Sequence, residues 1–411
     1  MEKIAYLTTS FGSLSHTFIR REIAELRKLG LDMSLFSVYP EVAVELSDED
    51  KLLAREADCL FPLETKIFPI IYSNIKFVIT SPAAYFDTLQ RILFNKEKNI
   101  ISYLRLVCIF FVSSYTALAL QKKNIVHVHA HFPFVSGAIT MCAAGILGIS
   151  YSITIHSPGA AISAKGLKQQ IAHAQFLCFP SQYTIDYYDR IIPCRKKAYL
   201  IHCGIDPDKY VHSVKQSFTK KRNKEEVHLI SIGRFIEKKG FIYLIEACNF
   251  LAEEGIRFKL IMIGDGPLRK KLQKKAEKYN LENSIIFKGA CSEAVVKQEL
   301  ERSDICVVPC ITDDTGKKEG IPVVIIEAVA LGIPVIATRH SGIPEIVNHT
   351  NTGILVPEKD AAAIAEAIKL LLRDDELREK CIKNARIKVI EEFNIRNTAK
   401  LLKKIFEKNI Q

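Results

Sequence analysis

Two glutamates, Glu319 and Glu327, stand with seven residues between them in EGIPVVIIEAVALGIPVIAT, a segment that is otherwise almost wholly apolar. An ionised carboxylate in an apolar core is costly unless it is hydrogen-bonded or paired. We expect a buried helix that begins at Pro322 and ends before Gly332. Both carboxylates would then suit one elongated ligand but not one metal ion. The simpler alternatives are a helix-dipole partner for Glu319 and an internal salt bridge for Glu327.

A second group of residues follows the predicted strand VHLISI. Gly233 and Arg234 come directly after it, and Lys239 follows five residues later, before Gly240 and a helix. A guanidinium and an ammonium beside a helix N-terminus suit a diphosphate, which needs several donors and net positive charge. An ordinary charged turn is the alternative.

The segment MIGDGPLRKKL contains a strand-to-helix turn with Gly264 and Gly266. It resembles half of a dinucleotide-binding fingerprint, but the third glycine is missing, and the chain has no GxxxxGK[ST] motif. Because glycine permits positive φ, tight-turn geometry is the simpler explanation of this pair.

Three histidines, His127, His129 and His131, alternate along IVHVHAHF and therefore face one side of a predicted strand. Three imidazoles can bind zinc, but no carboxylate or cysteine lies nearby in the sequence and strand spacing brings ring nitrogens together poorly. We expect one or two of them to reach a ligand as hydrogen-bond donors, with His127 structural. His156 closes the next predicted strand, YSITIH, at the matching end.

These residues lie on short β-rich runs that alternate with amphipathic helical stretches, which predicts parallel sheets covered by helices. A chain of 411 residues is too long for one hydrophobic core. The pattern breaks at a basic stretch near residues 213–227 and then restarts. The sequence therefore predicts an α/β protein with two doubly wound, Rossmann-like domains facing a cleft, in which ligands bind after the strands.

The net charge of +11 is concentrated in residues 66–123, where eight lysines and arginines stand against two acidic residues. Residues 100–120 are long enough to span a bilayer, but a buried helix leading into the histidine strand is the simpler interpretation. A basic, apolar region that docks on an anionic membrane surface is the other possibility. Nucleic acid is disfavoured as a partner, because the chain has no zinc-ligand spacing and no RNA-binding aromatic motif.

The scattered cysteines and the N-terminus, which has no secretory signal, indicate a cytoplasmic protein.

The order of motifs along the chain resembles that of the retaining glycosyltransferases of family 4, which have the two-domain GT-B architecture. The motifs are SLSHTFIRREI, HAHF, HCGID, GRFIEKKG, IGDGPL, EGIPVVIIEA and GIPEIV with TGILVP. The first three are most similar to the exopolysaccharide branch, which includes colanic-acid-type transferases. The resemblance implies an acceptor-binding domain at 1–212, a donor-binding domain at 213–394, and a helix at 395–411 that packs back towards the first domain.

The resemblance also implies roles for single residues. Arg234 and Lys239 would hold the donor's diphosphate, Glu319 would contact the donor sugar, and Glu327 would accept hydrogen bonds from the ribose. His131 would reach the sugar near its reacting centre, with His129 as the rival. The remaining donor-site residues would be Gly12, His156, Gly233, Gly264, Gly266, Gly320, Ile321 and Val323. Many family members carry a glycine where this chain has Pro322, which lacks an N–H, so one donor of the phosphate cradle is absent.

The implied reaction transfers a sugar from a UDP- or GDP-linked donor to a saccharide or lipid-linked acceptor, with retention at the anomeric carbon. No pair of carboxylates suits a double displacement, so departure and attack on one face are favoured. The family resemblance implies no cofactor and no metal, and the DDTG segment at Asp313 is expected to be a loop. A sugar-nucleotide epimerase of similar architecture and a non-catalytic nucleotide-sugar-binding protein are the alternatives. We expect a cytoplasmic location, with peripheral attachment to the inner face of the plasma membrane left open.

Overall fold

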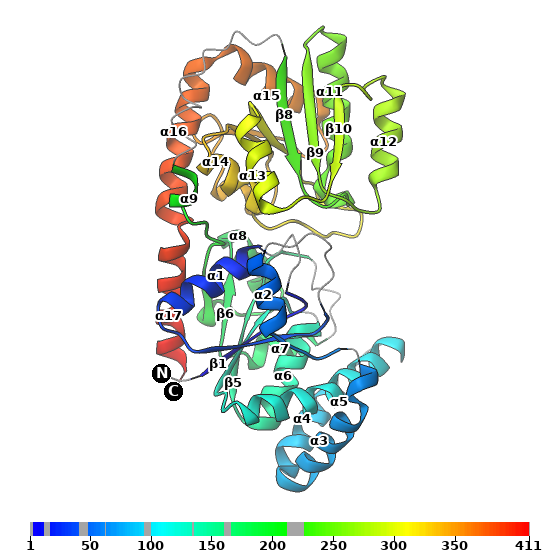
Figure 1. Cartoon of the computed structure of the whole chain (residues 1–411), viewed down its shortest axis with the longest axis vertical. Helices are drawn as coiled ribbons and strands as arrows, with labels where there is room; N and C mark the ends of the chain where they lie inside the picture. Colours follow the sequence, from blue (N-terminus) through cyan, green and yellow to red (C-terminus); the bar gives the residue numbers. More distant parts are fainter. Residues whose placement is uncertain are drawn as a thin grey trace. The chain divides into compact units, whose positions relative to one another are not determined.

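The structure is a computed structural model that describes residues 3–11, 17–40, 48–61, 63–93, 100–133, 135–159, 166–211 and 226–410. It divides into two compact units. One, the N-terminal domain, comprises Met1–His156, Ala160–Ile201 and Ala399–Gln411, and the other, the C-terminal domain, comprises Ser157–Gly159 and His202–Thr398. Each unit is a sheet flanked by helices (Figure 1). Most of the predicted basic linker lies outside the described residues.

In the N-terminal domain the described residues form a seven-stranded sheet of order β3-β2-β1-β4-β5-β6-β7, parallel throughout. Its strands are β1 (Ile4–Thr8), β2 (Met33–Ser37), β3 (Asp58–Cys59), β4 (His127–His131), β5 (Ser150–Thr154), β6 (Phe176–Phe179) and β7 (Ala198–Leu200). The sequence predicts all of these except β3 as the β-rich runs KIAYLTT, MSLFSV, IVHVHAHF, YSITIH, QFLCFP and KAYLIHC, and β3 has only two residues, too few for a sequence pattern. Successive residues of β1 alternate between two cores: Ala5 and Leu7 pack on one face, and Ile4 and Tyr6 on the other.

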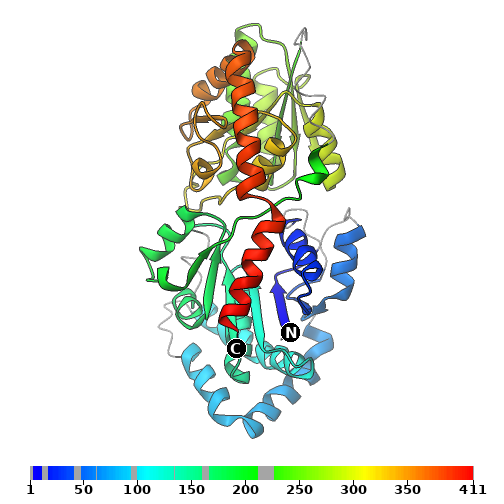
Figure 2. The same cartoon turned by 90° about the vertical axis from the view of Figure 1, so that its left-hand side faces the viewer.

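The helices of this domain cover both faces of the sheet. They are α1 (Thr17–Lys28), α2 (Asp48–Glu56), η1 (Leu63–Lys66), α3 (Ile67–Thr80), α4 (Pro82–Leu93), α5 (Ile100–Lys122), α6 (Val135–Leu147), α7 (Leu167–His173), α8 (Gln182–Asp189), η2 (Arg195–Lys197) and most of α17 (Ile395–Asn409). Gly30 follows α1 with a φ of 82°, the left-handed conformation that commonly ends a helix. From α17, Leu402 and Phe406 are buried in the same core as Tyr6, so this helix lies along the N-terminal sheet (Figure 2).

In the C-terminal domain the described residues form a six-stranded parallel sheet of order β10-β9-β8-β11-β12-β13. Its strands are β8 (Val227–Ile232), β9 (Phe258–Ile263), β10 (Ile285–Gly289), β11 (Ile305–Val308), β12 (Val335–Thr338) and β13 (Ile354–Val356). Its helices are α9 (Asp208–Val211), η3 (Glu237–Lys239), α11 (Phe241–Glu253), α12 (Arg269–Lys278), α13 (Glu293–Arg302), α14 (Val323–Ala330), η4 (Ile343–Glu345), α15 (Ala361–Arg373) and α16 (Asp375–Glu392). Both sheets have the strand order of a doubly wound fold, which confirms the predicted fold class. The cleft stays a prediction.

The helix predicted between the two glutamates is α14, and it is shorter than expected. Pro322 is its N-cap, with an extended ψ of 125°, so the helix begins at Val323 and the assignment of Pro322 to the first helical position was wrong by one residue. Gly332 follows the helix with a φ of 77°, as expected for a residue that ends it.

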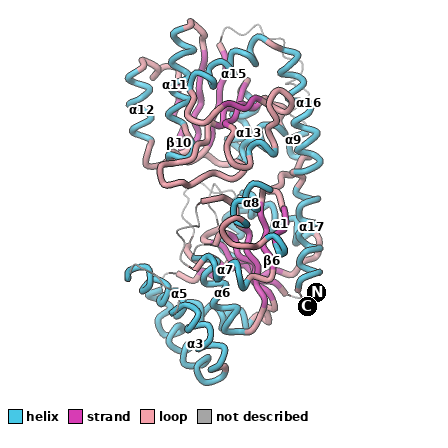
Figure 3. Tube along the Cα trace, turned by 180° about the vertical axis from the view of Figure 1, so that it is seen from behind, coloured by secondary structure: helices cyan, strands magenta, loops and turns pink. Residues whose placement is uncertain are grey.

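The apolar stretch at residues 100–120 belongs to α5, which leads into β4 and buries Phe110, Ala117 and Leu120 in the core. Among the described residues, no helix taken singly is both long and apolar enough to cross a membrane. The helices α3 and α4 meet that standard only as a pair, and a bend of 116° separates them. Figure 3 shows α3, α5 and α6 grouped beside the N-terminal sheet.

Candidate active site

Lys239 and Glu319 form an ion pair in the C-terminal domain. Lys239 Nζ lies 2.8 Å from Glu319 Oε2, and Lys238 Nζ lies 3.4 Å from the same oxygen. All three side chains are largely buried. Burial alone would raise the pKa of Glu319, but Lys239 and then Lys238 outweigh it and hold that pKa at about 2. Burial would lower the pKa of Lys239, and Glu319 raises it instead. Both groups are therefore charged at neutral pH.

Arg234 adds a third cation to this site. Its side chain is exposed, and within the described ranges it makes no hydrogen bond or ion pair, although its charge acts on Lys239. Lys238 and Lys239 pair with the one carboxylate of Glu319, and Arg234 adds a positive charge that acts on Lys239, which leaves a net positive charge. That balance suits an anion with several oxygens, such as a diphosphate.

The glycines predicted around this site are explained by close packing of two turns. The N–H of Phe235 donates to the carbonyl of Asp265 at 2.8 Å, which joins the turn after β8 to the turn after β9. A Cβ at Gly264 would lie 1.9 Å from the carbonyl oxygen of Gly233, and one at Gly266 would lie 2.7 Å from that of Phe235. Tight-turn geometry therefore accounts for Gly264 and Gly266, and their contact with a donor stays a prediction.

A histidine that the sequence did not single out holds the backbone of Glu319. The N–H of Glu319 donates to His340 Nε2 at 3.0 Å, and His340 Nδ1 lies 2.6 Å from Glu358 Oε1. Because Nε2 accepts, the proton of this imidazole is on Nδ1 and is donated to the carboxylate. Burial lowers the pKa of His340 against the opposing effect of Glu358, so the ring is neutral at pH 7. Glu358 also accepts from the N–H of Thr312 at 2.7 Å, which ties both ends of the loop 312–319 to one carboxylate.

The residues after Glu319 lead into α14. Gly320 and Ile321 are buried, and Val323 opens the helix half-exposed. The first N–H groups of a helix have no acceptor within it, so the amides at this end can meet an anion. Glu327 is half-buried on α14, beyond the first turn. Burial raises the pKa of the Cys306 thiol, and the charge of Glu327 raises it further.

In the N-terminal domain, two of the three alternating histidines are held by hydroxyl groups. The pairing of β4 with β5 sets His127 opposite Ser150 and His129 opposite Ser152. His127 contacts the hydroxyls of Ser150 and Ser152 at 2.7 Å each, and His129 contacts those of Ser152 and Thr154 at 2.7 and 2.8 Å. Both rings are fully buried. This confirms the structural interpretation of His127 and gives His129 the same environment.

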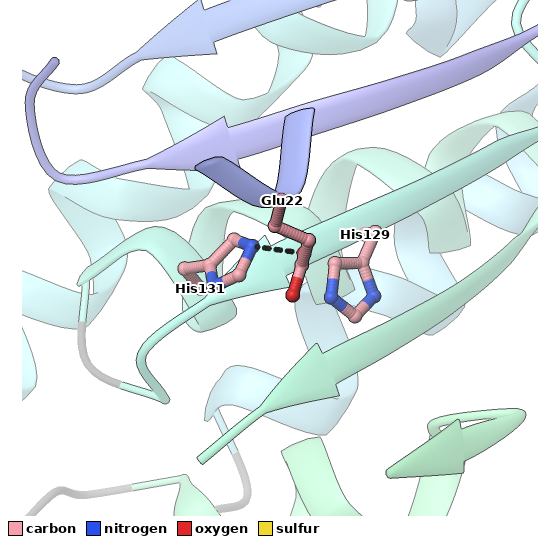
Figure 4. A group of neighbouring side chains, drawn as sticks. All are labelled: Glu22, His129 and His131. Carbon is pink, nitrogen blue, oxygen red and sulfur yellow. Dashed lines mark ion pairs between the residues drawn. The ribbon is translucent and has the colours of Figure 1, made fainter. Parts of the chain in front are cut away.

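His131 is also fully buried, but its partners are different. Its Nδ1 lies 2.9 Å from His156 Nε2, and its Nε2 lies 3.3 Å from Glu22 Oε1, an ion-pair distance without the alignment of a hydrogen bond (Figure 4). Tyr6 donates its hydroxyl to the same Glu22 oxygen at 3.0 Å. Glu22, His131 and His156 therefore form a continuous chain of polar groups. Glu22 and His156, at the two ends of this chain of groups, are partly exposed, whereas His131 between them is buried.

Glu22 corrects the argument against a metal at the histidines, because α1 brings a carboxylate to them from a distant part of the sequence. One ligand atom from each of Glu22, His129 and His131 lies within 4.8 Å of the others. However, each ring nitrogen of His129 already contacts a hydroxyl, and His131 Nδ1 already contacts His156. His131 Nε2 faces Glu22 without a hydrogen bond, but a metal would have to displace a hydroxyl from His129, so the arrangement fits a hydrogen-bonded chain better than a three-ligand coordination shell.

The structure thus brings the predicted residues together as two groups, one in each domain. It adds Lys238, His340 and Glu358 to the first group and Glu22 to the second. Glu22 belongs to the quoted motif SHTFIRREI, and this was the only signal of it in the sequence. Gly12, predicted to contact the diphosphate or the acceptor, lies outside the described residues.

Comparison with known protein families matches nearly the whole chain in two parts. Residues 17–209 match the model of Glycosyltransferase Family 4, and residues 213–388 match that of Glycosyl transferases group 1. The chain is 40% identical over 193 residues to a putative colanic acid biosynthesis glycosyltransferase, WcaL, of Salmonella typhimurium. This alignment covers 46% of this chain and 46% of WcaL. The chain is 33% identical over 213 residues to the amylovoran biosynthesis glycosyltransferase AmsK of Erwinia amylovora, which covers 52% of this chain and 51% of AmsK. These alignments span about half the length of the relatives.

The fold is similar to that of solved structures over its whole length. A crystal structure of Anabaena HepE in complex with UDP and glucose superposes with a TM-score of 0.71 at 15% identity, covering 99% of this chain and 100% of HepE. The two family regions meet where the first parallel sheet ends and the second begins, so the family matches and the fold agree on the same two-part organisation. The chain belongs to the glycosyltransferases, with a Glycosyltransferase Family 4 region followed by a Glycosyl transferases group 1 region.

Proposed function

We propose that this protein transfers a sugar from a nucleotide-diphosphate sugar to a saccharide or lipid-linked acceptor in the synthesis of a cell-surface polysaccharide, with retention at the anomeric carbon. The observation that carries the proposal is the pairing of two largely buried lysines, Lys238 and Lys239, with Glu319 just before α14, with Arg234 near enough for its charge to act on Lys239. The names of WcaL and AmsK support an exopolysaccharide product, and the UDP in the HepE structure supports a nucleotide-sugar donor.

The cationic cluster would act on the leaving group. As the bond from the sugar to the diphosphate breaks, negative charge grows on the phosphate oxygens, and fixed cations lower the barrier where that charge develops. In the absence of donor, Lys239 is neutralised by Glu319. A diphosphate would compete for the ammonium, which releases the Glu319 carboxylate to accept hydrogen bonds from sugar hydroxyls. Arg234 and the amides of Gly320, Ile321 and Val323 would add donors to the phosphates.

Retention follows, in this proposal, from departure and attack on the same face of the sugar. A double displacement needs a carboxylate nucleophile at the anomeric carbon, whereas in this proposal the Glu319 carboxylate accepts hydrogen bonds from sugar hydroxyls. The departing phosphate would then accept the proton of the acceptor hydroxyl. No cofactor is needed for this chemistry, and the arginine and lysines supply the positive charge that a metal ion supplies in other transferases.

The resemblance assigns the donor-sugar contact to His131, with His129 as the rival, and we infer that His156, two residues after β5, makes that contact instead. His129 and His131 are buried and contact other side chains, whereas His156 is partly exposed and its Nε2 contacts Nδ1 of His131. Glu327 would accept hydrogen bonds from the ribose.

All eleven cysteines are free, which supports a reducing, cytoplasmic compartment for the reaction.

The test is incubation of the protein with a panel of UDP- and GDP-sugars, with and without saccharide acceptors, followed by detection of free nucleoside diphosphate and of epimerised donor. A transferase releases nucleoside diphosphate in step with glycosylated acceptor. Epimerised donor without diphosphate release would establish the epimerase instead, and donor binding without turnover would leave a nucleotide-sugar-binding protein.

A further inference from the structure

The helix α3 exposes its apolar side chains to solvent instead of burying them. Phe68 is 84% exposed and Ile79 is 72% exposed, and Ile71, Tyr72 and Ile75 are each more than half exposed. These five residues follow helical spacing, so they form one stripe along the helix. Of the fourteen residues in α3, the side chains that are buried are those of Ser73 and Phe77. An amphipathic helix of a globular domain normally shows the opposite arrangement.

The neighbouring helices also expose large apolar side chains. Phe86 of α4 is 53% exposed, and Leu93 of α4 and Phe111 of α5 are also exposed. We call the exposed large apolar residues of α3 and α4 the α3–α4 apolar face; they are Ile67, Phe68, Ile71, Tyr72, Ile75, Val78, Ile79, Phe86 and Leu93. So many exposed large apolar side chains on two consecutive helices indicate a binding surface in a folded protein.

The orientation of α3 is fixed by polar contacts on its inner side. The Asn74 side chain donates to the carbonyl of Phe111 at 3.2 Å and accepts from the hydroxyls of Tyr85 and Ser114 at 2.7 and 2.9 Å. These bonds tie α3 to both α4 and α5. Because the helix cannot rotate without breaking them, the apolar face stays directed outward.

Basic residues flank this face. Lys66 precedes α3. Lys76 lies within α3, and the helix contains no acidic residue to balance its charge. A pocket of 490 Å³ lies beside the start of α3, and Lys66, Lys122 and Lys123 are among its lining residues. Lys66 lies over the ring of Tyr115, and Lys123 pairs with Asp58 at 2.7 Å. Three ammonium groups against one carboxylate give this rim a positive charge.

We propose that the α3–α4 apolar face docks on an anionic phospholipid bilayer, with α3 lying in the plane of the interface. A helix of fourteen residues is about 21 Å long, shorter than the hydrocarbon core of a bilayer, and the bend of 116° after it prevents α3 and α4 from forming one straight span. Exposed phenylalanines and isoleucines flanked by lysines are the composition of an interfacial helix, in which apolar side chains enter the acyl region and lysines meet the phosphates.

A second copy of the chain fits this face less well than a bilayer. In a symmetric dimer the same patch covers itself, which would bring Lys66 and Lys76 of one copy towards the same lysines of the other. An anionic bilayer instead complements these charges. The occupant is therefore a lipid surface in this proposal, and self-association is an outcome that the test can detect.

The chain contains no tryptophan, so a single substitution supplies an unambiguous fluorescent probe. Phe68→Trp places it at the centre of the proposed contact, and Ile390→Trp, at an exposed position of α16, serves as the matched control. With vesicles of equal parts phosphatidylglycerol and phosphatidylcholine, the emission of Phe68→Trp shifts to the blue and is quenched by brominated acyl chains, whereas that of Ile390→Trp does neither. An unshifted Phe68→Trp spectrum at low salt overturns the proposal.

Vesicle flotation of the full chain tests affinity. Phe68→Asp/Ile79→Asp lowers the bound fraction at least about tenfold, whereas Ile387→Asp/Ile390→Asp, a matched pair of exposed residues in α16, binds as the wild type does. Lys66→Ala/Lys76→Ala weakens binding several-fold, and added salt weakens it further. If the wild type binds vesicles of pure phosphatidylcholine as well as it binds anionic vesicles, the proposal of an anionic bilayer is overturned. A dimer in solution that Phe68→Asp dissociates, with no vesicle binding, assigns the face to self-association and overturns the proposal. Neither assay depends on catalytic activity, so both are independent of the proposed function.

Discussion

Lys239 and Glu319 come from distant segments of the chain, yet their charged groups lie 2.8 Å apart inside the C-terminal domain. The pair is a neutral unit within a cluster that carries an excess of positive charge. In the proposed function, a diphosphate, which carries more negative charge than Glu319, takes Lys239 from it and leaves the carboxylate available for sugar hydroxyls.

The first prediction concerns Gly240, which begins α11 with a φ of 66°. A Cβ there would lie 1.8 Å from the carbonyl oxygen of Pro309, whereas Gly255 has a similar φ of 72° and no atom within 4 Å of a built Cβ. Gly255→Ala carries the conformational cost alone, about 1 kcal/mol. Gly240→Ala adds the backbone clash, and we expect a loss of more than about 3 kcal/mol. Urea denaturation compares the two, and equal losses would show that space at Gly240 is not limiting.

The second prediction concerns pH. Burial lowers the pKa of His127 to about 3, while the unfolded chain titrates near the ordinary value of 6.5. The unfolded state therefore binds a proton that the folded state does not, and stability is lost as the pH falls from 6.5 towards 3. The slope from this residue is about 1.4 kcal/mol per pH unit. We expect His127→Gln to flatten the decline between pH 6 and pH 4 by that amount in urea denaturation. An unchanged slope would mean that His127 is charged in the folded state.

Much of the scaffold, but less of the site, was predictable from sequence. Apolar runs such as IAYLT and FLCF identify buried parallel strands because both sheet faces are covered. The alternation of His127, His129 and His131 predicts their shared face for the same geometric reason. The contacts of Glu22 with His131 and of His340 with Glu319 join segments whose separation has no period, so no spacing rule announces them. The strand β3 was missed because two residues carry no pattern.

The third prediction concerns Glu22. Its carboxylate faces His131 Nε2, which favours a proton on that nitrogen and leaves Nδ1 to accept from His156. Glu22→Gln keeps the size and removes the charge. We expect imidazole nitrogen NMR shifts to change from a single His131 tautomer to a mixture, and kcat to fall about tenfold with little change in KM for the donor. Stoichiometric zinc in the purified protein, lost in Glu22→Gln, would contradict this role and assign the group to a metal.

The fourth prediction concerns His340. His340→Ala leaves the Glu319 N–H and the Glu358 carboxylate without their shared partner, and we expect a loss of about 2–3 kcal/mol in unfolding free energy. His340→Gln can bridge the same two groups and is expected to recover part of the stability and of the donor affinity. Calorimetric donor titration of both variants is the measurement. Equal donor affinity in wild type and His340→Ala would show that the loop 312–319 is held without this histidine.

The most direct measurement is the affinity for UDP and GDP of variants at the cationic cluster. Arg234→Ala and Lys239→Ala each remove a cation proposed to contact the diphosphate, and we predict that whichever nucleotide binds the wild type binds each variant at least about tenfold more weakly. Lys275→Ala, which removes a lysine paired with Glu246 at 2.7 Å in the same domain, is predicted to bind as the wild type does. Wild-type affinity in both Arg234→Ala and Lys239→Ala would contradict the proposed diphosphate site.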